Sequence, residues 1–282
     1  MPEVPRRLVV NADDLGFARE VNEGILEAHS RGIVRAASLL ATGPAFQHAV
    51  ALARRTPTLE VGVHLALVGL PSALDGRPLP PTLPALLRQL ALGRLPVRQE
   101  LAAQVLRVLE AGIQPTHLDT HKHTHLIPPV LEAVGSLARQ FGIRWIRRPF
   151  DFPRPAAPWP ERVRARAWLL LAGGFDRRLA RFGCRTTDHF AGLRLTGRFG
   201  PAELVRLITE LPPGSTEFMC HPGRCGPELM AARTRLKQSR ERELAALTAP
   251  EVFQALRRAE IALAGFRELD GPSTAKPPWP CL

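Results

Sequence analysis

The residues with the clearest capacity for chemistry lie at positions 117–125, where polar side chains recur at every second position. Imidazole and carboxylate groups are common ligands of divalent metal ions. On an extended strand, residues two apart share a face at a spacing of about 6.6 Å, so the run would span about 26 Å and cannot gather on one ion. If the strand ends near residue 119, one or two histidines beyond it can turn into a site, while the others support the ligands or contact substrate. The side chains concerned are His117, Asp119, His121, His123 and His125.

Two adjacent carboxylates, Asp13 and Asp14, follow shortly after a strand-like run at residues 7–11. Neighbouring carboxylates repel each other, so the pair is best accommodated where a cation neutralises one, or where different surroundings give them different roles. An aspartate that caps a helix would explain one of the two but not the other. The pair therefore indicates metal binding or proton transfer.

Two further histidines, His64 and His221, each come at or just after the end of a strand-like run. Either could be a buried, hydrogen-bonded histidine, although a pKa near neutrality also suits His221 for proton transfer. Cys220 precedes His221 and could be interpreted as a nucleophile beside its base. Adjacent residues on an extended chain point to opposite faces, which argues against that interpretation.

These polar residues depend on an alternation of strands and helices for their positions. Strands are predicted at residues 7–11, 36–40, 60–65, 116–119, 143–146 and 216–220, and helices at 21–30, 45–54, 129–141, 240–247 and 250–265. Such an alternation predicts a mostly parallel sheet in an α/β fold, closed into a distorted (β/α) barrel. In these barrels chemistry collects at the carboxyl ends of the strands, which is where the polar clusters lie.

The chain is predicted to contain a single catalytic domain, residues 1–265, followed by a Pro-rich tail at residues 266–282. Two proline-rich stretches, residues 69–84 and 149–160, are predicted to be long loops that wall a substrate cleft. No apolar run approaches the roughly 20 residues needed to cross a bilayer. The first residues lack the features of a signal peptide, which predicts a cytoplasmic location with reduced cysteines.

The formal net charge is +12, and its basic residues are 35 Arg and 3 Lys spread along the chain among acidic residues. A basic surface can attract nucleic acid or anionic lipid. No helix-turn-helix, zinc-finger or RNA-binding signature is visible, so no nucleic-acid partner is expected. A weak association with a membrane surface stays open, and a homo-oligomer is the expected assembly.

Four blocks of the sequence resemble the YdjC-like carbohydrate deacetylases, the family that includes chitooligosaccharide deacetylase and the hopanoid-biosynthesis-associated deacetylases. The blocks are NADDLGF at 11–17, VGVHL at 61–65, HLDTHKHTH at 117–125 and EFMCHPG at 217–223. They occur in the family's order, between about residues 7 and 247. Thr120 stands where serine is common, and residues 69–98 match poorly, which leaves the identity of the sugar open.

The resemblance implies a metal-dependent hydrolase that removes N-acetyl groups from an amino sugar, carried on an oligosaccharide or a glycolipid. It implies one divalent ion bound by Asp14, His64 and His121, with Asp13 as catalytic base and His221 as acid. Magnesium is the ion that the family suggests, whereas ligand softness favours zinc or another transition metal. Arg147 and Arg148 are expected to help fix a polar substrate group, and Asp119, His123 and His125 to support the ligands or contact substrate.

Two other functions remain open from the residues alone. A metal-dependent phosphoesterase can use similar ligands in a barrel, although such sites often hold two metals and need more carboxylates. A non-catalytic metal-binding or nucleic-acid-binding protein is the second alternative, and the positive charge is its only support.

Overall fold

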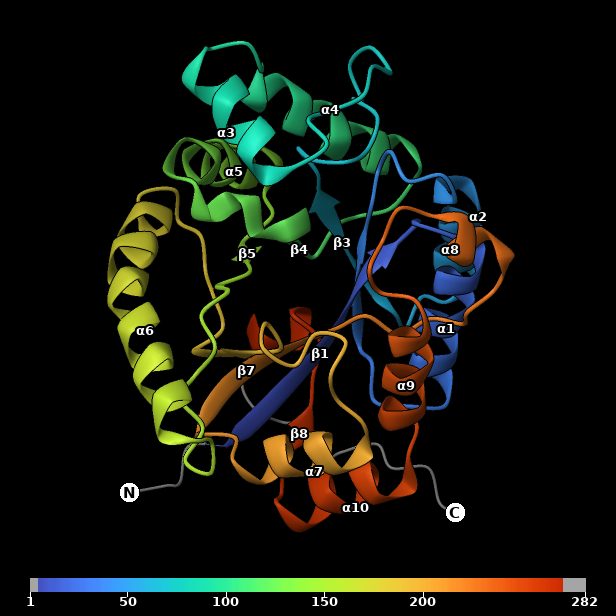
Figure 1. Cartoon of the computed structure of the whole chain (residues 1–282), viewed down its shortest axis with the longest axis vertical. Helices are drawn as coiled ribbons and strands as arrows, with labels where there is room; N and C mark the ends of the chain where they lie inside the picture. Colours follow the sequence, from blue (N-terminus) through green and yellow to red (C-terminus); the bar gives the residue numbers. More distant parts are fainter. Residues whose placement is uncertain (1–4, 271–282) are drawn as a thin grey trace.

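The computed structural model describes residues 5–270, and its strands form one parallel sheet that curls into a distorted barrel (Figure 1). The strand order is β5-β4-β3-β2-β1-β7-β6, and β8 also pairs with β1. Isolated bridges from Trp145 to Arg185 and from Asp151 to Phe190 connect the segment around β5 with β6 across the open side. The predicted (β/α) barrel is thereby confirmed. The strands are β1 (Arg6–Leu15), β2 (Ala36–Leu39), β3 (Glu60–Leu65), β4 (His117–Thr120), β5 (Trp145–Ile146), β6 (His189–Ala191), β7 (Gly214–Cys220) and β8 (Ala262–Leu263).

Helices surround the sheet and cover its outer face (Figure 1). Neighbouring helices pack against one another in this ring, as α4 does on α5, α5 on α6, and α7 on α10. The helices are α1 (Arg19–Ser30), α2 (Phe46–Arg55), α3 (Leu83–Ala91), α4 (Val97–Glu110), α5 (Pro128–Phe141), α6 (Trp159–Ala180), α7 (Pro201–Thr209), α8 (Pro227–Ala231), α9 (Gln238–Leu247) and α10 (Pro250–Arg258), with 3₁₀ segments η1 (His121–Leu126) and η2 (Arg267–Asp270).

Local sequence explains the elements that lead to the site. In β1, Leu8, Val9 and Val10 are fully buried, and in α1 the apolar residues at helical spacing face the core. α5 begins with prolines, whose fixed φ suits the first turn. It ends at Gly142, which takes the left-handed conformation (φ 70°) that a glycine adopts without steric cost.

The predicted helix at residues 250–265 is wrong beyond residue 258. α10 ends at Arg258, and Glu260 has a φ of 52°, which helical backbone does not allow. The chain then extends, and Ala262 and Leu263 pair with the beginning of β1 as β8. A short apolar run after a helix cannot be distinguished from more helix by periodicity alone.

The predicted tail at 266–282 lies outside the described residues from position 271 onward. Within its first part, Phe266 and Leu269 are buried, and the ring of Phe266 stacks on His117 at 4.2 Å between centroids. Packing therefore continues to Asp270. Among residues 5–270, every helix is too short or too polar to cross a bilayer.

Candidate metal and catalytic site

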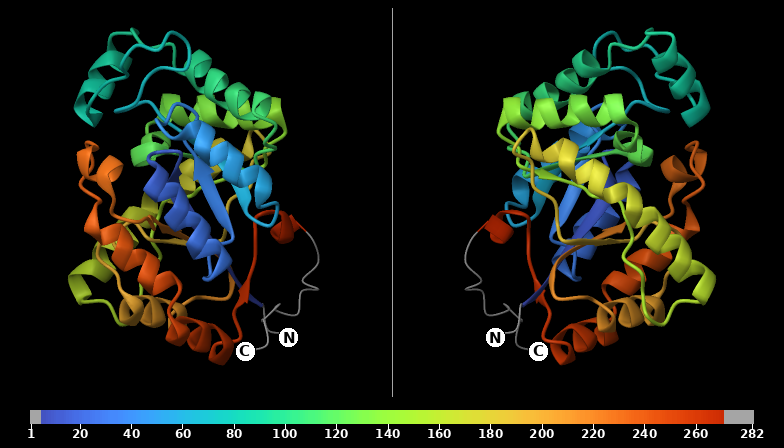
Figure 2. Two further views of the ribbon diagram at one scale, coloured as in Figure 1. Left: turned by 90° about the vertical axis from the view of Figure 1, so that its right-hand side faces the viewer. Right: turned by 90° about the vertical axis from the view of Figure 1, so that its left-hand side faces the viewer.

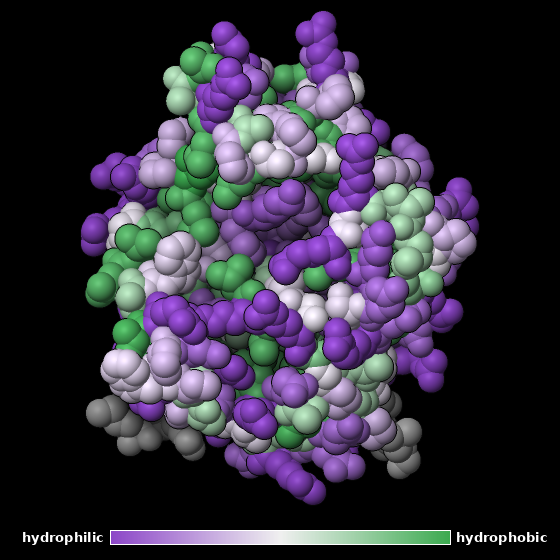
Figure 3. Space-filling model, viewed as in Figure 1, coloured by the Kyte–Doolittle hydropathy of each residue, from purple (hydrophilic) through white to green (hydrophobic). Residues whose placement is uncertain are grey.

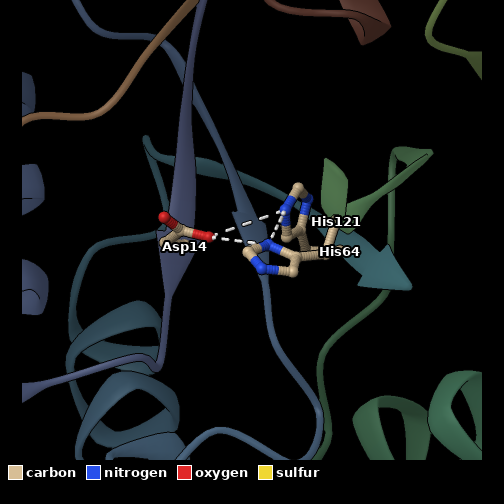
Figure 4. A group of neighbouring side chains, drawn as sticks. All are labelled: Asp14, His64 and His121. Carbon is tan, nitrogen blue, oxygen red and sulfur yellow. Dashed lines mark hydrogen bonds and ion pairs between the residues drawn. The ribbon is translucent and has the colours of Figure 1, made fainter. Parts of the chain in front are cut away.

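Three side chains converge at the carboxyl ends of three strands of the barrel, two of which are neighbours in the sheet (Figure 4). Asp14 comes from β1, His64 from β3, and His121 follows β4. Asp14 Oδ1 lies 3.6 Å from His64 Nε2 and 3.3 Å from His121 Nδ1, and the two histidine nitrogens are 3.3 Å apart. One carboxylate oxygen and two imidazole nitrogens at these separations can bind a single cation.

An irregularity at the end of β1 brings both carboxylates to the site. The β1–β2 register shifts between Ala12 and Leu15, and Asp14 has a φ of 69°, in the left-handed region. A hydrogen bond to α1 holds this turn in place, because the Gly16 amide donates to Asn22 Oδ1 at 2.6 Å. On a regular strand Asp13 and Asp14 would face opposite sides. Here both line the same cleft.

The histidine run stops being a strand at Thr120. Lys122 and His123 have φ values of 55° and 52°, so the chain turns tightly and leaves His121 alone in the cluster with Asp14 and His64. His123 lines the cleft, but it is not part of the cluster.

The other two histidines of the run support the architecture. His125 Nε2 donates to the Arg147 carbonyl at 3.0 Å, and its Nδ1 lies 2.5 Å from Thr120 Oγ1, which ties η1 to the segment after β5. His117 lies inside the barrel against Gly62, where an added Cβ would come within 2.5 Å of its ring. Gly62 is therefore glycine because an imidazole occupies the space of its side chain.

A chain of buried hydrogen bonds sets the orientation of His64. Its Nδ1 donates to Asp119 Oδ1 at 2.8 Å, which leaves Nε2 facing Asp14 and His121. Ser38 donates to Asp119 Oδ2 at 2.8 Å and lies 3.0 Å from His117 Nε2. Burial alone would lower the pKa of His64, but Asp119 and Asp13 raise it to about 9. The site therefore attracts a positive charge at this position, from a proton or a cation.

Arg147 is the centre of a buried ion cluster behind the site. Its guanidinium donates two hydrogen bonds of 2.7 Å to Asp13, lies 2.8 Å from Asp119 Oδ2 and donates to Glu217 at 2.7 Å. It is 1% exposed and does not line the cleft, so it positions Asp13 and does not reach a substrate from there. Arg148 points elsewhere, to Asp176 on α6.

Sequence reasoning missed Arg240, on α9. Its Nη2 lies 2.5 Å from Asp14 Oδ2, so it occupies one carboxylate oxygen and leaves the other toward the histidines. Burial opposes ionisation of Asp14, but Arg240 and the nearby His121 hold the pKa of Asp14 well below its usual value. The Arg240 side chain also packs against Gly223, where an added Cβ would lie 3.1 Å from it.

His221 also lines the cleft, and its Nε2 lies 3.9 Å from Asp13 Oδ2. Glu243, which sequence reasoning also missed, accepts a hydrogen bond of 2.6 Å from the His221 amide and fixes the turn. Burial lowers the pKa of His221 to about 4, so its ring is neutral at pH 7. Cys220 is fully buried, and burial raises the pKa of its thiol well above the usual value, which removes it as a nucleophile.

A cleft of about 820 Å³ gives access to these groups. Figure 3 shows the corresponding hollow at the centre of this face. Of the two predicted wall loops, residues 69–84 contribute Leu70, Pro78 and Leu79, whereas residues 149–160 contribute no lining. A volume of this size accommodates a ligand of one or two sugar rings.

Comparisons with known proteins show the family and the fold of this chain. The family model described as YdjC-like protein matches residues 7–258. A carbohydrate deacetylase of Brevibacillus brevis is 32% identical over 275 residues, which cover 93% of this chain and 99% of the relative. A chitooligosaccharide deacetylase of Klebsiella pneumoniae is 33% identical, over 77% of this chain and 81% of its own. A crystal structure from Enterococcus faecalis, described provisionally as a cellobiose-phosphate cleavage protein, has a TM-score of 0.73 at 25% identity and covers 94% of this chain and 99% of its own.

Proposed function

Because this chain belongs to the YdjC-like protein family, we propose that it removes the acetyl group from an N-acetylated amino sugar with the help of one divalent metal ion. The chain is accordingly a hydrolase of amide bonds. The observation that carries the proposal is the convergence of Asp14, His64 and His121 at the floor of the cleft, next to Asp13 and His221.

The residues present fit a metal ion. Within residues 5–270, the buried Asp14 Oδ1 makes no hydrogen bond, although two histidine nitrogens lie within 3.6 Å. The second nitrogen of His64 is held by a carboxylate, an arrangement that recurs around metal-bound histidines. Two imidazole donors favour zinc or another transition ion, whereas magnesium prefers oxygen ligands and water.

When bound, the divalent ion would polarise the acetamide carbonyl and lower the pKa of a nearby water. In this proposal Asp13 takes the proton from that water. Its Oδ1 accepts from Asn11 at 3.0 Å and from Arg147 at 2.7 Å, whereas Oδ2, on the side of His221, accepts from Arg147 alone at 2.7 Å and is the freer acceptor. Arg147 keeps this carboxylate in one orientation, so little reorganisation is needed when the proton moves.

In this proposal His221 protonates the departing amine, which is too basic to leave as an anion. Its ring is neutral at pH 7, because burial lowers its pKa to about 4. The proton must therefore reach it during the reaction, and Asp13, 3.9 Å away, is its nearest source once the water has been deprotonated. A histidine with a lowered pKa is a stronger acid when protonated, so it transfers the proton readily.

A two-metal phosphoesterase is less well supported. The second cluster that could hold a cation, Asp13, His64 and Asp119, shares His64 with the first. The guanidinium of Arg147 already lies 2.7 Å from Asp13 and 2.8 Å from Asp119, so a positive charge is in place there. One ion is therefore the arrangement that these residues support.

The test is acetate release by the purified protein from a panel of N-acetylated chitooligosaccharides and N-acetylglucosaminyl lipids, before and after metal removal. Release that stops on chelation and returns with zinc or another divalent ion supports the proposal. Acetate release that continues in metal-free protein contradicts the metal role, and no release from any acetylated sugar contradicts the activity. The cytoplasmic location and the homo-oligomer expected from the sequence stay predictions.

A further inference from the structure

Three elements project beside the opening of the cleft and form its rim, which we define as α3, α8 and the first turn of α6. The two side views show all three on the same side of the molecule (Figure 2). The segments that adjoin α3 and α8 contribute Leu79, Pro81, Arg233 and Arg235 to the lining of the cleft. Whatever contacts the rim therefore also faces the opening of the candidate active site.

Each of the three rim elements exposes a large apolar side chain. Trp159 at the start of α6 is 72% exposed, Leu87 of α3 is 47% exposed, and Met230 of α8 is also exposed. Leu83, one helical turn before Leu87, extends the apolar face of α3. A surface helix normally turns polar residues outward, so a leucine face on α3 indicates a partner that covers it.

The rim is also positively charged. The segment at residues 76–99, which contains α3, has arginines but no Asp or Glu. Arg88 and Arg94 of this segment, and Arg233 and Arg235 beside α8, are exposed. Within the described part of the chain these four arginines form no salt bridge, whereas the acidic residue of α8, Glu228, is paired with Arg19 at 3.5 Å.

We propose that this rim docks on the surface of an anionic lipid bilayer, with the cleft opening toward the headgroups. Apolar side chains interleaved with arginines match a lipid interface, where the former enter the acyl boundary and the latter meet the phosphates. A second copy of the chain is a poorer partner, because it would bring two positively charged rims together in a protein of net charge +12.

Docking in this orientation selects substrates by their location. If the proposed deacetylase activity is correct, on which this consequence rests, sugars linked to membrane lipids would reach the cleft without leaving the bilayer surface. Substrates of this class compete well with soluble oligosaccharides because the enzyme and the sugar are concentrated on the same surface.

Co-sedimentation of the full chain with vesicles tests the docking without any catalysis. Vesicles of phosphatidylcholine with about one third phosphatidylglycerol are compared with pure phosphatidylcholine, at low and high salt. We expect binding to the anionic vesicles only, weakened by salt. Leu87→Ser should lower the partition coefficient at least about tenfold, and Arg88→Gln with Arg94→Gln should lower it about fivefold per arginine.

Leu106→Ser is the matched control, because Leu106 has a similar exposure of 44% but lies on α4, which is not part of the rim. Equal loss in the two leucine variants, equal binding to neutral vesicles, or no binding at all overturns the proposal. A dimer in sedimentation velocity that Leu87→Ser abolishes, without vesicle binding, assigns the rim to a second copy. Acetate release from N-acetylated chitobiose is measured in parallel, and Leu87→Ser should match the wild-type rate, so failure of docking and failure of the activity are distinguishable.

Discussion

Replacing Asp119 by asparagine should weaken metal binding, although all three proposed ligand residues stay unchanged. Asp119 Oδ1 accepts from His64 Nδ1, while Oδ2 accepts from Ser38 and lies 2.8 Å from Arg147. Arginine can only donate hydrogen bonds. An asparagine at this position must therefore turn its oxygen toward Arg147 and its amide NH₂ toward His64.

This orientation reverses the tautomer of His64. In the Asp119→Asn variant the new NH₂ group donates where the carboxylate accepted, so His64 Nδ1 becomes the acceptor and Nε2 carries the proton. Nε2 is the atom that faces Asp14 and His121 at 3.6 and 3.3 Å. Loss of a partner that orients a metal ligand costs roughly 10- to 100-fold in affinity, and the wrong tautomer places Asp119→Asn at the upper end, about 100-fold or about 2.8 kcal/mol.

The assay is a competition titration of zinc between the protein and a chromogenic chelator, with urea unfolding to verify that the variant is folded. Ser38→Ala is the matched control, since it removes one hydrogen bond from Asp119 Oδ2 and leaves Oδ1 facing His64. We expect less than about a tenfold loss for Ser38→Ala. A folded Asp119→Asn variant with wild-type zinc affinity would refute the assignment of His64 Nε2 as a ligand.

Three further changes test other parts of the account. Asp13→Asn should keep its metal yet lose roughly 10²- to 10⁴-fold in acetate release, because an amide cannot accept the proton of water; normal turnover would exclude Asp13 as the base. Gly62→Ala should lower the free energy of unfolding in urea by about 1–3 kcal/mol, because its Cβ would lie 2.5 Å from His117, whereas Gly174→Ala in α6, with open space around it, should raise it by about 0.5–1 kcal/mol. Burial raises the pKa of Glu243 from 4.5 to about 7, so the folded state binds this proton more tightly; its contribution to stability is complete below about pH 4.5 and is lost as the pH rises through 7. The free energy of unfolding of Glu243→Gln should therefore fall less between pH 5 and pH 8 than that of the wild type, and equal slopes would contradict the shift.

Most of the barrel was predictable because its strands are short apolar runs that end in polar residues. β3 has the predicted bounds, and β1, β2, β4 and β7 differ from prediction only at their ends. α6 was not predicted, since its exposed face carries leucines and arginines together and gives no clear periodicity. β8 lies in a segment for which the sequence predicts helix, because two residues are too few to show a strand pattern.

The candidate site was predictable where chemistry follows a strand directly. Asp13, Asp14, His64 and His221 all line one cleft. The choice among the alternating histidines could not come from spacing, because it depends on the positive φ values of Lys122 and His123. Arg240 could not be found either, since it reaches Asp14 across a separation of 226 residues and only the packing of α9 against α1 brings them together.

Metal content by mass spectrometry of the purified His121→Ala and His123→Ala variants tests the central claim most directly. The two histidines are close neighbours in the same turn, and both line the cleft, but only His121 lies in the cluster with Asp14 and His64. We predict about one ion per chain in the wild type and in His123→Ala, and none in His121→Ala. An ion retained by His121→Ala and lost from His123→Ala would contradict the account.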